Sequence, residues 1–301
     1  MVRLVETVEE VRAEVRAARG SGRVVGLVPT MGALHAGHAR LIERCRAEAG
    51  LVIVSVFVNP LQFGPAEDYG RYPRALEDDL RVSERAGADL VFAPTAETMY
   101  PRGRDGTTFV EVPGLSDVLE GASRPGHFRG VATVVLKLFA ITGADVAFFG
   151  AKDYQQQVLI RRMVEDLNLP VAVRTVGTVR EADGLALSSR NRYLNPEERR
   201  AATVLSRALR RAREAVAAGE RDGNRVRQVL TETIESEQAA RLDYAEVADA
   251  ESLQPLAELA PGRRAVGLLA VRVGATRLID NAVLTDTDWD SDEDRTGPGC
   301  G

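Results

Sequence analysis

The chain has 301 residues, of which 45% are hydrophobic and 28% charged, a composition typical of a globular protein with a sizeable core. Six acidic residues and one arginine in the segment 286–295 account for the formal net charge of −5, so the rest of the chain is close to neutral. This balance argues against a protein that binds nucleic acid through a basic surface, and no apolar run is long enough to span a bilayer.

The two cysteines, Cys45 and Cys300, lie near opposite ends of the chain and do not indicate a disulfide framework. The first twenty residues carry charges throughout, which is unlike a secretory signal peptide. Both features favour a reducing compartment. We therefore expect a cytoplasmic protein.

Strands and helices are expected to alternate through the first 180 residues. Apolar runs predict buried strands, and apolar residues at helical spacing predict helices between them. The strands are expected at 23–30, 51–58, 88–94, 144–149 and 170–176, and the helices at 6–18, 38–50, 73–86, 128–142 and 153–168. This alternation predicts an α/β fold, a Rossmann-like doubly wound parallel sheet, as a first domain of residues 1–180.

The pattern changes after the last of these strands. The segment 177–190 is polar and contains glycine, and a helix is expected from 196 to 219, with Asn195 as N-cap, Pro196 at the first position and Glu198 at the third. After a further helix, strands at 241–250, 265–273 and 276–284 predict a smaller α+β domain, 181–285. The acidic tail, 286–301, which contains the single Trp289, is expected to be disordered.

The string "PTMGALHAGH", residues 29–38, joins the first of the buried strands to its helix, where doubly wound folds bind nucleotides. It holds His35 and His38, two of the three histidines of the chain. They could serve as helix-start residues that satisfy backbone groups. A metal pair is improbable because no further ligand stands at a useful spacing. They could also donate hydrogen bonds to a phosphate in its transition state.

Two further strings follow predicted strands. In "SVFVNPLQF", residues 55–63, Asn59 and Gln62 fall at the carboxyl end of a strand, although a turn begun by Asn59 would also explain them. In "FFGAKDYQQQ", residues 148–157, Asp153 and Gln156 have capping-box spacing. Capping does not explain Lys152, because a cation at a helix N-terminus is unfavourable by ~0.3–1 kcal/mol. A bound polyanion would reverse that sign.

Three other segments carry polar groups whose role the residues leave open. The hydroxyls and arginine of "LSSRN", residues 187–191, suit a phosphate clamp or a solvated loop. For His127, in the segment 119–131, a structural role that organises the loop is favoured over catalysis. Asp78 and Asp79 fall on a predicted helix, where a solvated face is the favoured interpretation.

The H-x-G-H pattern resembles the HIGH signature of the nucleotidylyltransferase superfamily. The string 29–38 and four further motifs, in the same order over residues 24–285, resemble the pantothenate synthetase (pantoate–β-alanine ligase) family. This resemblance implies an ATP-dependent, AMP-forming condensation of (R)-pantoate with β-alanine. A pantoyl adenylate would be the intermediate, and AMP and pyrophosphate would be released.

The resemblance also implies a set of site residues. His38, His35, Lys152 and Arg190 would be catalytic. ATP would contact Met31, Gly32, Ala33, Leu34, His35, Ala36, Gly37, His38, Gly150, Ala151, Lys152, Asp153, Val179, Leu187, Ser188, Ser189 and Arg190. Pantoate and β-alanine would contact Gln62, Gln156, Asn59, Phe57 and Phe63, and Asp78 is a candidate ligand of Mg²⁺.

Two positions depart from the family pattern: Ala151 replaces a glutamate and Leu187 a methionine. The family further implies a homodimer, small-molecule substrates, and no nucleic-acid or membrane partner. The second domain, hinged near residue 180, would act as a lid that keeps water from the acyl adenylate.

Two other functions are compatible with an ATP site of this kind. A nucleotidylyltransferase would move AMP onto a phosphorylated acceptor, which would call for more arginine or lysine around the acceptor than "NPLQF" offers. A catalytically silent ATP-binding module would not need the histidines, the lysine and the hydroxyl clamp together. Product identity and pantoate-dependent ATP–pyrophosphate exchange distinguish these functions from the ligase.

Overall fold

The computed structural model describes residues 1–65 and 67–285, so the acidic tail, 286–301, with Trp289 and Cys300 lies outside the described residues. The described chain divides into two compact units. The first holds residues 1–151 and 155–176, and the second holds 152–154 and 177–285. The division at 176/177 lies close to the domain boundary expected at 180. The short segment Lys152–Tyr154, however, groups with the second unit.

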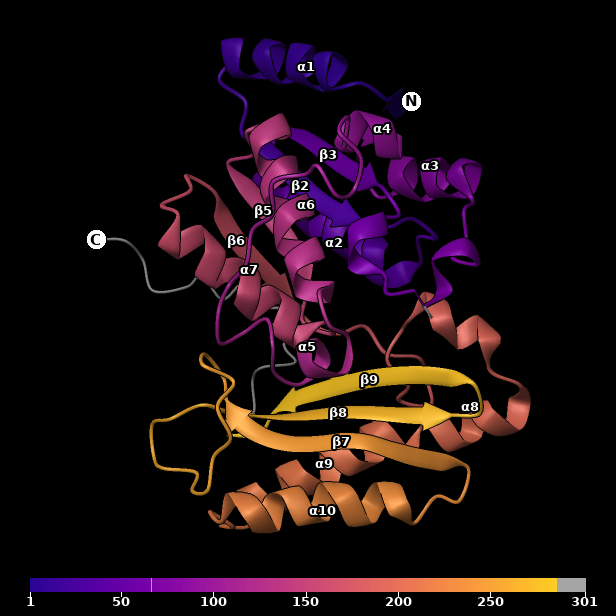
Figure 1. The fold of residues 1–301 in the computed structure, drawn as a ribbon, viewed down its shortest axis with the longest axis vertical. Coiled ribbons are helices and arrows are strands. Elements are labelled where there is room, and N and C mark those ends of the chain that lie inside the picture. Colours follow the sequence, from indigo (N-terminus) through magenta and orange to yellow (C-terminus); the bar gives the residue numbers. More distant parts are fainter. Residues whose placement is uncertain (66, 286–301) are drawn as a thin grey trace. The chain divides into compact units, whose positions relative to one another are not determined.

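A six-stranded sheet forms the centre of the first unit (Figure 1). Its strands are β1 (Arg3–Val5), β2 (Val25–Thr30), β3 (Leu51–Val56), β4 (Leu90–Phe92), β5 (Val146–Gly150) and β6 (Ala172–Val176). They lie in the order β1-β4-β3-β2-β5-β6, and every pairing is parallel. The doubly wound α/β fold predicted from the alternating pattern is confirmed. The short edge strand β1 was not predicted, because three residues carry too little periodicity.

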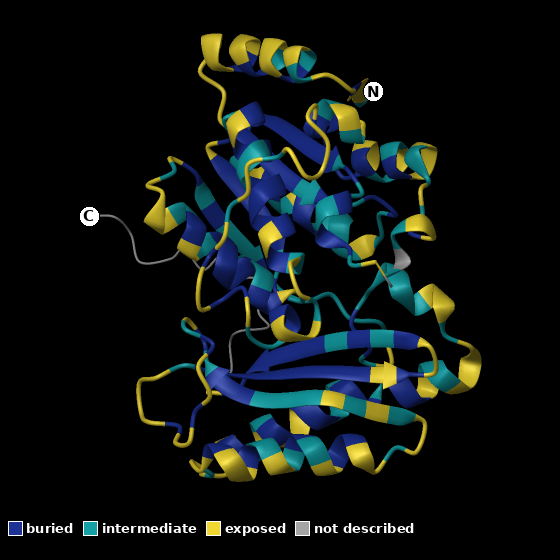
Figure 2. Cartoon of the chain, in the orientation of Figure 1, coloured by how far each residue is buried: buried dark blue, intermediate teal, exposed yellow. Residues whose placement is uncertain are grey.

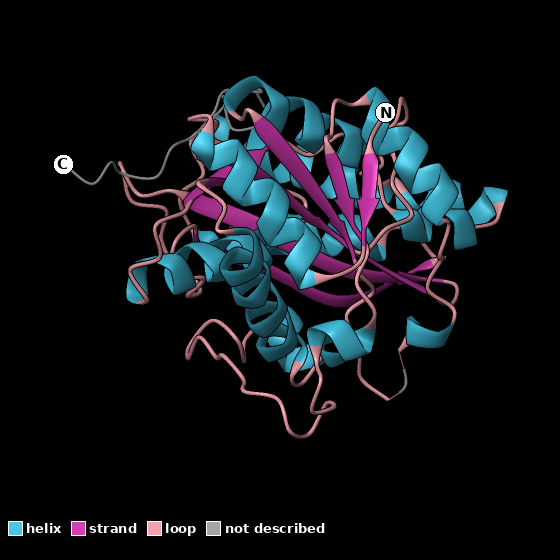
Figure 3. Ribbon diagram, turned by 90° about the horizontal axis from the view of Figure 1, so that it is seen from above, coloured by secondary structure: helices cyan, strands magenta, loops and turns pink. Residues whose placement is uncertain are grey.

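Helices cover both faces of this sheet (Figure 3). The longer ones are α1 (Val8–Gly20), α2 (Ala36–Glu48), α3 (Leu76–Arg85), α6 (His127–Thr142) and α7 (Tyr154–Asp166), and the single-turn ones are α4 (Ala96–Met99) and α5 (Glu120–Ser123). Two 3-10 turns, η1 (Pro60–Gln62) and η2 (Asp68–Gly70), follow β3. Helix α2 packs its apolar face, with Ile42 and Cys45, against buried valines of β2 and β3. Figure 2 shows the strands of this sheet as largely buried, as the near-continuous apolar runs predict.

The strand order places a topological switch point beside β2. From β2 the chain proceeds outward through β3 to β4, whereas β5 pairs with the other edge of β2 and continues to β6. Ligands of open α/β sheets bind outside the carboxyl ends of the strands at such a point. The segment that follows β2 is the one that carries the two histidines.

The second unit is a three-stranded antiparallel sheet with helices. Strands β7 (Ala240–Asp249), β8 (Ala265–Val273) and β9 (Thr276–Val283) lie in the order β7-β8-β9. Helices α9 (Val204–Ala217) and α10 (Gly223–Glu235) pack together and bury leucines such as Leu209 and Leu230 in one core with β8. This smaller α+β domain agrees with the prediction.

The start of the first helix in this unit was predicted correctly, but its length was not. Asn195 caps α8 (Pro196–Ala202) and Glu198 completes the capping box, with proline at the first position. The expected continuous helix 196–219 is wrong, because α8 ends at Ala202 and α9 begins at Val204. The Thr203 hydroxyl donates to the Arg200 carbonyl at 2.7 Å, so this side chain competes with the helical hydrogen-bond pattern at the break.

Candidate active site

His35 and His38 form a reciprocal cap at the start of α2. His35 is the N-cap residue, and its Nδ1 accepts a hydrogen bond from the Gly37 nitrogen at 3.2 Å. His38, at the third position, accepts from the His35 nitrogen through its own Nδ1 at 3.2 Å. The two ring centroids lie 4.1 Å apart. The helix-start interpretation of these histidines is therefore correct for one nitrogen of each ring.

The cap also fixes the tautomer of both rings. A nitrogen that accepts a hydrogen bond carries no proton, so the neutral imidazoles of His35 and His38 hold their proton on Nε2. Each ring thus donates from the edge opposite to the one that caps the helix. Capping and donation to a phosphate are compatible roles of the same side chains.

Asp79 holds the loop that precedes these histidines. Its buried carboxylate, with 1% of the residue exposed, accepts from the backbone nitrogens of Leu34 at 2.7 Å and Ala33 at 3.2 Å. At Gly32, with φ of +82°, a Cβ atom would lie 2.8 Å from Asp79 Oδ2, so the position requires glycine. Asp79 was expected on a solvated helix face, and that expectation is wrong. The neighbouring Asp78 is exposed and pairs with Arg81.

A second cluster follows β3 and centres on the buried Asn59. Its Nδ2 donates to Gln62 Oε1 at 3.0 Å and to the Gly130 carbonyl at 3.1 Å. Its Oδ1 accepts from the Tyr100 hydroxyl at 2.8 Å and from the Leu61 nitrogen at 3.2 Å. Gln62 in turn donates from Nε2 to the sulfur of Met31 at 3.0 Å, so the loop that follows β2 and the one that follows β3 meet.

Phe57 and Phe63 are buried in the same part of the first unit. The ring of Phe57 lies 6.1 Å from that of Tyr100, and Phe63 contacts Tyr69 and Tyr72 at 5.5 and 5.9 Å between centroids. These aromatic contacts give the Gln62 segment a rigid apolar surround. Helix α6 approaches this segment closely, because a Cβ at Gly130 would lie 2.4 Å from the Leu61 carbonyl oxygen.

His127 has the structural role favoured from the sequence. Its Nδ1 lies 2.8 Å from the Gln62 carbonyl oxygen, which can only accept, and its Nε2 lies 3.1 Å from Arg124 Nη1. Burial, followed by the charge of Arg124, lowers the pKa of His127 to about 4. Burial alone would raise the pKa of Glu67, but its hydrogen bonds with Arg124 and the charge of that residue outweigh this effect and lower the pKa. This network ties the backbone of Gln62 to α6.

The three consecutive glutamines at the start of α7 have different partners. Gln155 is buried and bonds the Glu120 nitrogen and the Leu115 and Val118 carbonyls. Gln157 accepts from Arg161 and Thr175. Gln156 is half-buried, and within residues 1–65 and 67–285 its side-chain amide has no hydrogen-bond partner. Of the three glutamines, Gln156 is therefore the one whose side-chain amide could form hydrogen bonds with a ligand.

The segment Lys152–Tyr154 is anchored within the second unit. The Lys152 carbonyl accepts from Asn281 Nδ2 at 2.6 Å, and the Tyr154 hydroxyl donates to the Ala250 carbonyl at 2.9 Å. The ammonium of Lys152 lies 3.5 Å from Asp153 Oδ1. Gly150 ends β5, and Ala151, which is buried, donates its N–H to the Val176 carbonyl. Helix α7 begins at Tyr154, so Asp153 precedes it, but the capping box predicted for Asp153 and Gln156 lacks its second half, because the Gln156 side-chain amide makes no hydrogen bond among the described residues.

The Ser188–Arg190 segment is held by hydrogen bonds within the second unit. Ser188 accepts from the Arg190 nitrogen and opens the 3-10 turn η3 (Ser189–Tyr193). The Leu187 nitrogen donates to the Val179 carbonyl at 2.9 Å, which brings together the two positions expected at the adenine. Arg180 and Asp280 form a two-fold hydrogen-bonded ion pair at 2.7 and 3.0 Å that fixes the start of this loop.

The predicted site residues thus fall into two groups. The first unit brings together the histidine loop, Asn59 and Gln62, and the second carries Lys152, Val179 and the segment 187–190. The sequence pattern missed the roles of Asp79, Tyr100 and Glu67, which support the first of these groups through hydrogen bonds within the first unit. Among the described residues no cluster of three or more His, Cys, Asp or Glu could hold a metal ion, and Asp78 as a magnesium ligand stays a prediction. No described helix is long and apolar enough to cross a membrane.

Comparisons with known proteins find similar proteins over nearly the whole chain. Residues 3–283 match the model of the pantoate-beta-alanine ligase family. The pantothenate synthetase of Heliobacterium modesticaldum is 56% identical over 283 residues, which cover 94% of this chain and 99% of that protein. The crystal structure of the pantothenate synthetase of Thermus thermophilus is similar with a TM-score of 0.88 at 49% identity, covering 95% of this chain and 100% of that one. The pantoate-beta-alanine ligase of Francisella tularensis, solved with beta-gamma ATP and beta-alanine, has a TM-score of 0.76 at 32% identity over 95% and 99% of the two chains.

Proposed function

The chain belongs to the pantoate–β-alanine ligase family, and from this premise we propose how its two units share the residues of one ATP-dependent ligation. The enzyme condenses (R)-pantoate with β-alanine to form pantothenate. A pantoate carboxylate oxygen attacks the α-phosphorus of ATP and displaces pyrophosphate, which gives pantoyl adenylate. The amine of β-alanine then attacks the acyl carbon, loses a proton and displaces AMP.

The first unit is proposed to supply the donors of the adenylation step. The observation that carries this assignment is the reciprocal cap, which leaves the Nε2 proton of His35 and of His38 as the donor of each ring. Donors fixed before the reaction stabilise negative charge as it develops, and each is worth ~2.7–4 kcal/mol in comparable sites. The loop lies at the switch point of the sheet, which supports phosphate binding there.

The amides of Gln62 and Gln156 are proposed to bind pantoate, and Phe57 and Phe63 to form the apolar wall beside it. The half-buried position of Gln156, and the lack of a partner for its amide among the described residues, support this role. Lys152, Ser188, Ser189 and Arg190 are proposed to bind the phosphates, and Val179 and Leu187 the adenine. That these residues share the second unit supports their acting as one set.

The second unit, 177–285, is proposed to act as a lid during the lifetime of the adenylate, because an acyl adenylate hydrolyses in water. A magnesium ion would neutralise phosphate charge, but the described residues form no cluster that fits it as a protein-held ion, and Asp78 already pairs with Arg81. ATP phosphates supply most ligands of such an ion.

A cytoplasmic homodimer is proposed as the working state of the enzyme. The compartment is supported by cysteine usage, because Cys45 is a free thiol and not part of a disulfide. The dimer is supported only by the family resemblance, and light scattering of the purified chain tests it. A mass near that of one chain would exclude it.

Pantoate-dependent exchange of pyrophosphate into ATP tests the assignment directly. We expect exchange with (R)-pantoate in the absence of β-alanine, and release of AMP and pantothenate once β-alanine is added. A panel of hydroxy acids measures how far the site discriminates against acids that lack the gem-dimethyl group. A stable adenylylated product would support the nucleotidylyltransferase alternative, and exchange independent of pantoate would contradict the ligase.

A further inference from the structure

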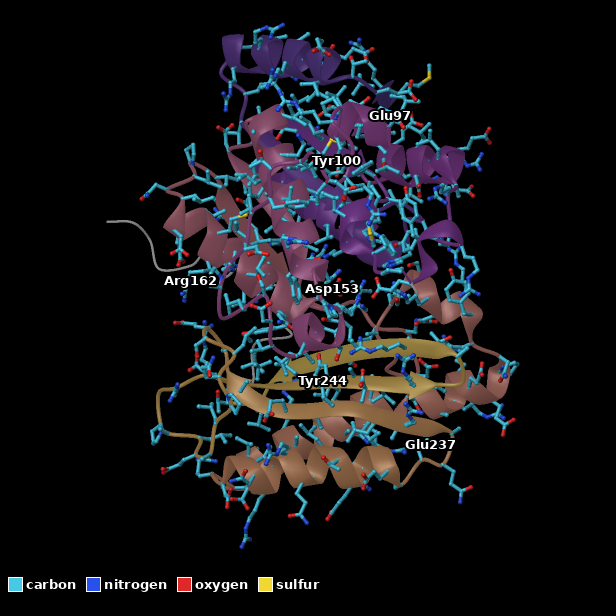
Figure 4. The ribbon with its side chains drawn as sticks, in the orientation of Figure 1. Glu97, Tyr100, Asp153, Arg162, Glu237 and Tyr244 are labelled. Atoms are coloured by element: carbon cyan, nitrogen blue, oxygen red, sulfur yellow. The ribbon has the colours of Figure 1, made fainter. Side chains whose placement is uncertain are left out.

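We propose that Tyr100 is a positioning residue that acts through Asn59 and fixes which end of the Gln62 amide faces the substrate. The inference rests on the proposed role of Gln62 in binding pantoate and extends it. Tyr100 follows α4, far in sequence from β2 and β3, and its role is independent of the sequence motifs. Figure 4 labels it together with the exposed Glu97 of the same segment, whereas Tyr100 is only 4% exposed.

The orientation of the Asn59 amide is determined by two backbone groups. The Gly130 carbonyl can only accept, so the atom of Asn59 that lies 3.1 Å from it is the Nδ2 donor. The Leu61 N–H can only donate, so the atom 3.2 Å from it is the Oδ1 acceptor. If the amide were reversed, Nδ2 would face the Leu61 N–H, donor against donor, and Oδ1 would face the Gly130 carbonyl, acceptor against acceptor. Asn59 is 1% exposed, so water could not relieve these contacts.

This orientation leaves Asn59 fully engaged. A side-chain amide has two hydrogens and two lone pairs. The hydrogens go to the Gly130 carbonyl and Gln62 Oε1, and the lone pairs accept from the Leu61 N–H and the Tyr100 hydroxyl. Asn59 could contact pantoate only by giving up one of these bonds. The structure therefore assigns it to the support of Gln62, whereas the sequence resemblance implied a substrate contact.

The polarity of Gln62 follows from that of Asn59. Because Asn59 Nδ2 donates to Gln62 Oε1, the Nε2 end of the Gln62 amide points the other way, toward Met31. The thioether sulfur of Met31 is a weak acceptor, and the –NH₂ group has two hydrogens. Gln62 thus presents a donor, which suits the carboxylate and hydroxyl oxygens of a hydroxy acid. The acceptor that would suit an ammonium group, Oε1, lies at the end of the amide that faces Asn59.

Tyr100 completes this set because its hydroxyl fills the last lone pair of Asn59. Its donor role is stable over the working pH range, since burial raises the pKa of the Tyr100 phenol and keeps it protonated. The ring is held from two sides, with Phe57 at 6.1 Å between centroids and the Lys137 ammonium 5.7 Å above it. A rigid ring places the hydroxyl in one position. The Tyr100 hydroxyl therefore fixes the orientation of the Asn59 amide, and Asn59 in turn fixes the orientation of the Gln62 amide.

The test is the exchange reaction of Tyr100→Phe, which removes the hydroxyl and keeps the ring. Loss of one neutral hydrogen bond corresponds to a change of roughly 3- to 10-fold. We expect the KM for pantoate to rise by about this factor while the KM for ATP and the kcat stay within about twofold. Thr142→Val is the matched control, because it removes a buried hydroxyl that donates only to the Leu138 carbonyl of its own helix at 2.8 Å. It should lower the Tm to a similar degree and leave both KM values unchanged.

A double-mutant cycle with Gln62→Ala tests the pantoate role of Gln62 and the positioning role of Tyr100 separately. In the Gln62→Ala background, Tyr100→Phe should have no further effect on the KM for pantoate, because its effect acts through Gln62. Equal effects in both backgrounds would overturn the positioning role and leave the pantoate role of Gln62 intact. A Gln62→Ala enzyme with unchanged KM for pantoate would refute the pantoate role itself, and the inference with it. Parallel changes in both KM values in Tyr100→Phe would show a general structural effect and would also overturn the proposal.

Discussion

The carboxylate of Asp79 accepts a hydrogen bond from the backbone nitrogen of Leu34 at 2.7 Å, across forty-five residues of sequence. This bond joins the first turn of α3 to the loop from which the histidine pair emerges. The loop has two consecutive residues at positive φ, Gly32 and Ala33, and a non-glycine residue in that region is strained by roughly 1–2 kcal/mol. The buried carboxylate holds the backbone in this conformation.

Asp79→Asn should therefore weaken both the fold and the reaction. An amide has one acceptor atom, so its –NH₂ group would face one of the two N–H donors of the loop, and a loss of about 1–3 kcal/mol is expected. Asp78→Asn is the matched control, because Asp78 is exposed and pairs with Arg81, and a change within about 0.5 kcal/mol is expected there. Urea unfolding and pyrophosphate exchange measure both variants.

Equal losses of stability in the two variants would contradict the loop-holding role of Asp79. The same pair of variants also tests the magnesium prediction. A rise in the Mg²⁺ concentration needed for half-maximal exchange, confined to Asp78→Asn, would assign the ion to Asp78. An unchanged requirement would remove Asp78 as a ligand.

The burial of Asp79 could have been predicted from helical spacing, but the adjacent pair of acids, Asp78 and Asp79, suggested a solvated face instead. Leu76, Asp79, Leu80 and Ser83 follow helical spacing and lie on one face of α3, of which Asp79 and Ser83 are buried. The contacts of Asn59 with Tyr100 and with Gly130 had no such signal, because they span 41 and 71 residues. Local patterns predict elements and helix caps, as at Asn195, but do not predict which distant side chains meet.

A second prediction separates the capping role of His35 from its proposed donor role. Asparagine is among the preferred N-cap residues, so His35→Asn keeps an acceptor for the Gly37 nitrogen and removes the imidazole. We expect it to retain the stability of the wild type and to lower the kcat of adenylation. His35→Ala should lower the kcat similarly and also destabilise the protein by about 0.5–2 kcal/mol. Full activity of His35→Asn would show that His35 only caps the helix and is not a donor in the reaction.

A third prediction concerns His38, whose Nε2 proton is the proposed donor to the phosphate. His38→Ala should lower the kcat by ~10²–10³, equivalent to ~2.7–4 kcal/mol. The control is Glu10→Ala in α1, because Glu10 occupies the same third position and accepts from its N-cap backbone, that of Thr7, at 3.1 Å. Both variants lose the same kind of cap, and only His38→Ala should lose activity. A folded His38→Ala enzyme with near-normal pyrophosphate release would exclude His38 from the mechanism.

A fourth prediction addresses Lys152. Its carbonyl, and not its side chain, makes the 2.6 Å hydrogen bond with Asn281, so Lys152→Ala keeps the anchor of the segment. The variant should raise the KM for ATP and slow adenylation, with little change in the KM for pantoate or in the Tm. Asn281→Ala removes the anchor and keeps the ammonium, so a smaller effect on the KM for ATP is expected from it. Unchanged ATP kinetics in Lys152→Ala would leave only a structural role for this stretch.

The fifth prediction is a pH dependence of stability that originates at His127. Burial and the Arg124 charge lower the pKa of His127 to about 4 in the folded state, whereas an unfolded histidine titrates near pH 6.5. Between these values the unfolded state binds the proton more tightly, so the stabilisation is complete above about pH 6.5 and is lost as the pH falls toward 4. The shift contributes roughly 2 kcal/mol to the free energy of unfolding, because the partial exposure of His127 reduces its full value.

Urea unfolding of the wild type and of His127→Asn at several pH values between 4.5 and 7 measures this contribution of His127 to stability. Asparagine keeps an N–H donor for the Gln62 carbonyl but does not titrate, so the variant should show a flatter loss of stability in this window. Glu120 and Glu67 also face the imidazole, and, although burial opposes it, the hydrogen bonds and charge of Arg124 lower the pKa of Glu67. If the variant and the wild type lost stability with the same slope, the proton would be bound elsewhere, and the buried neutral state of His127 would be refuted.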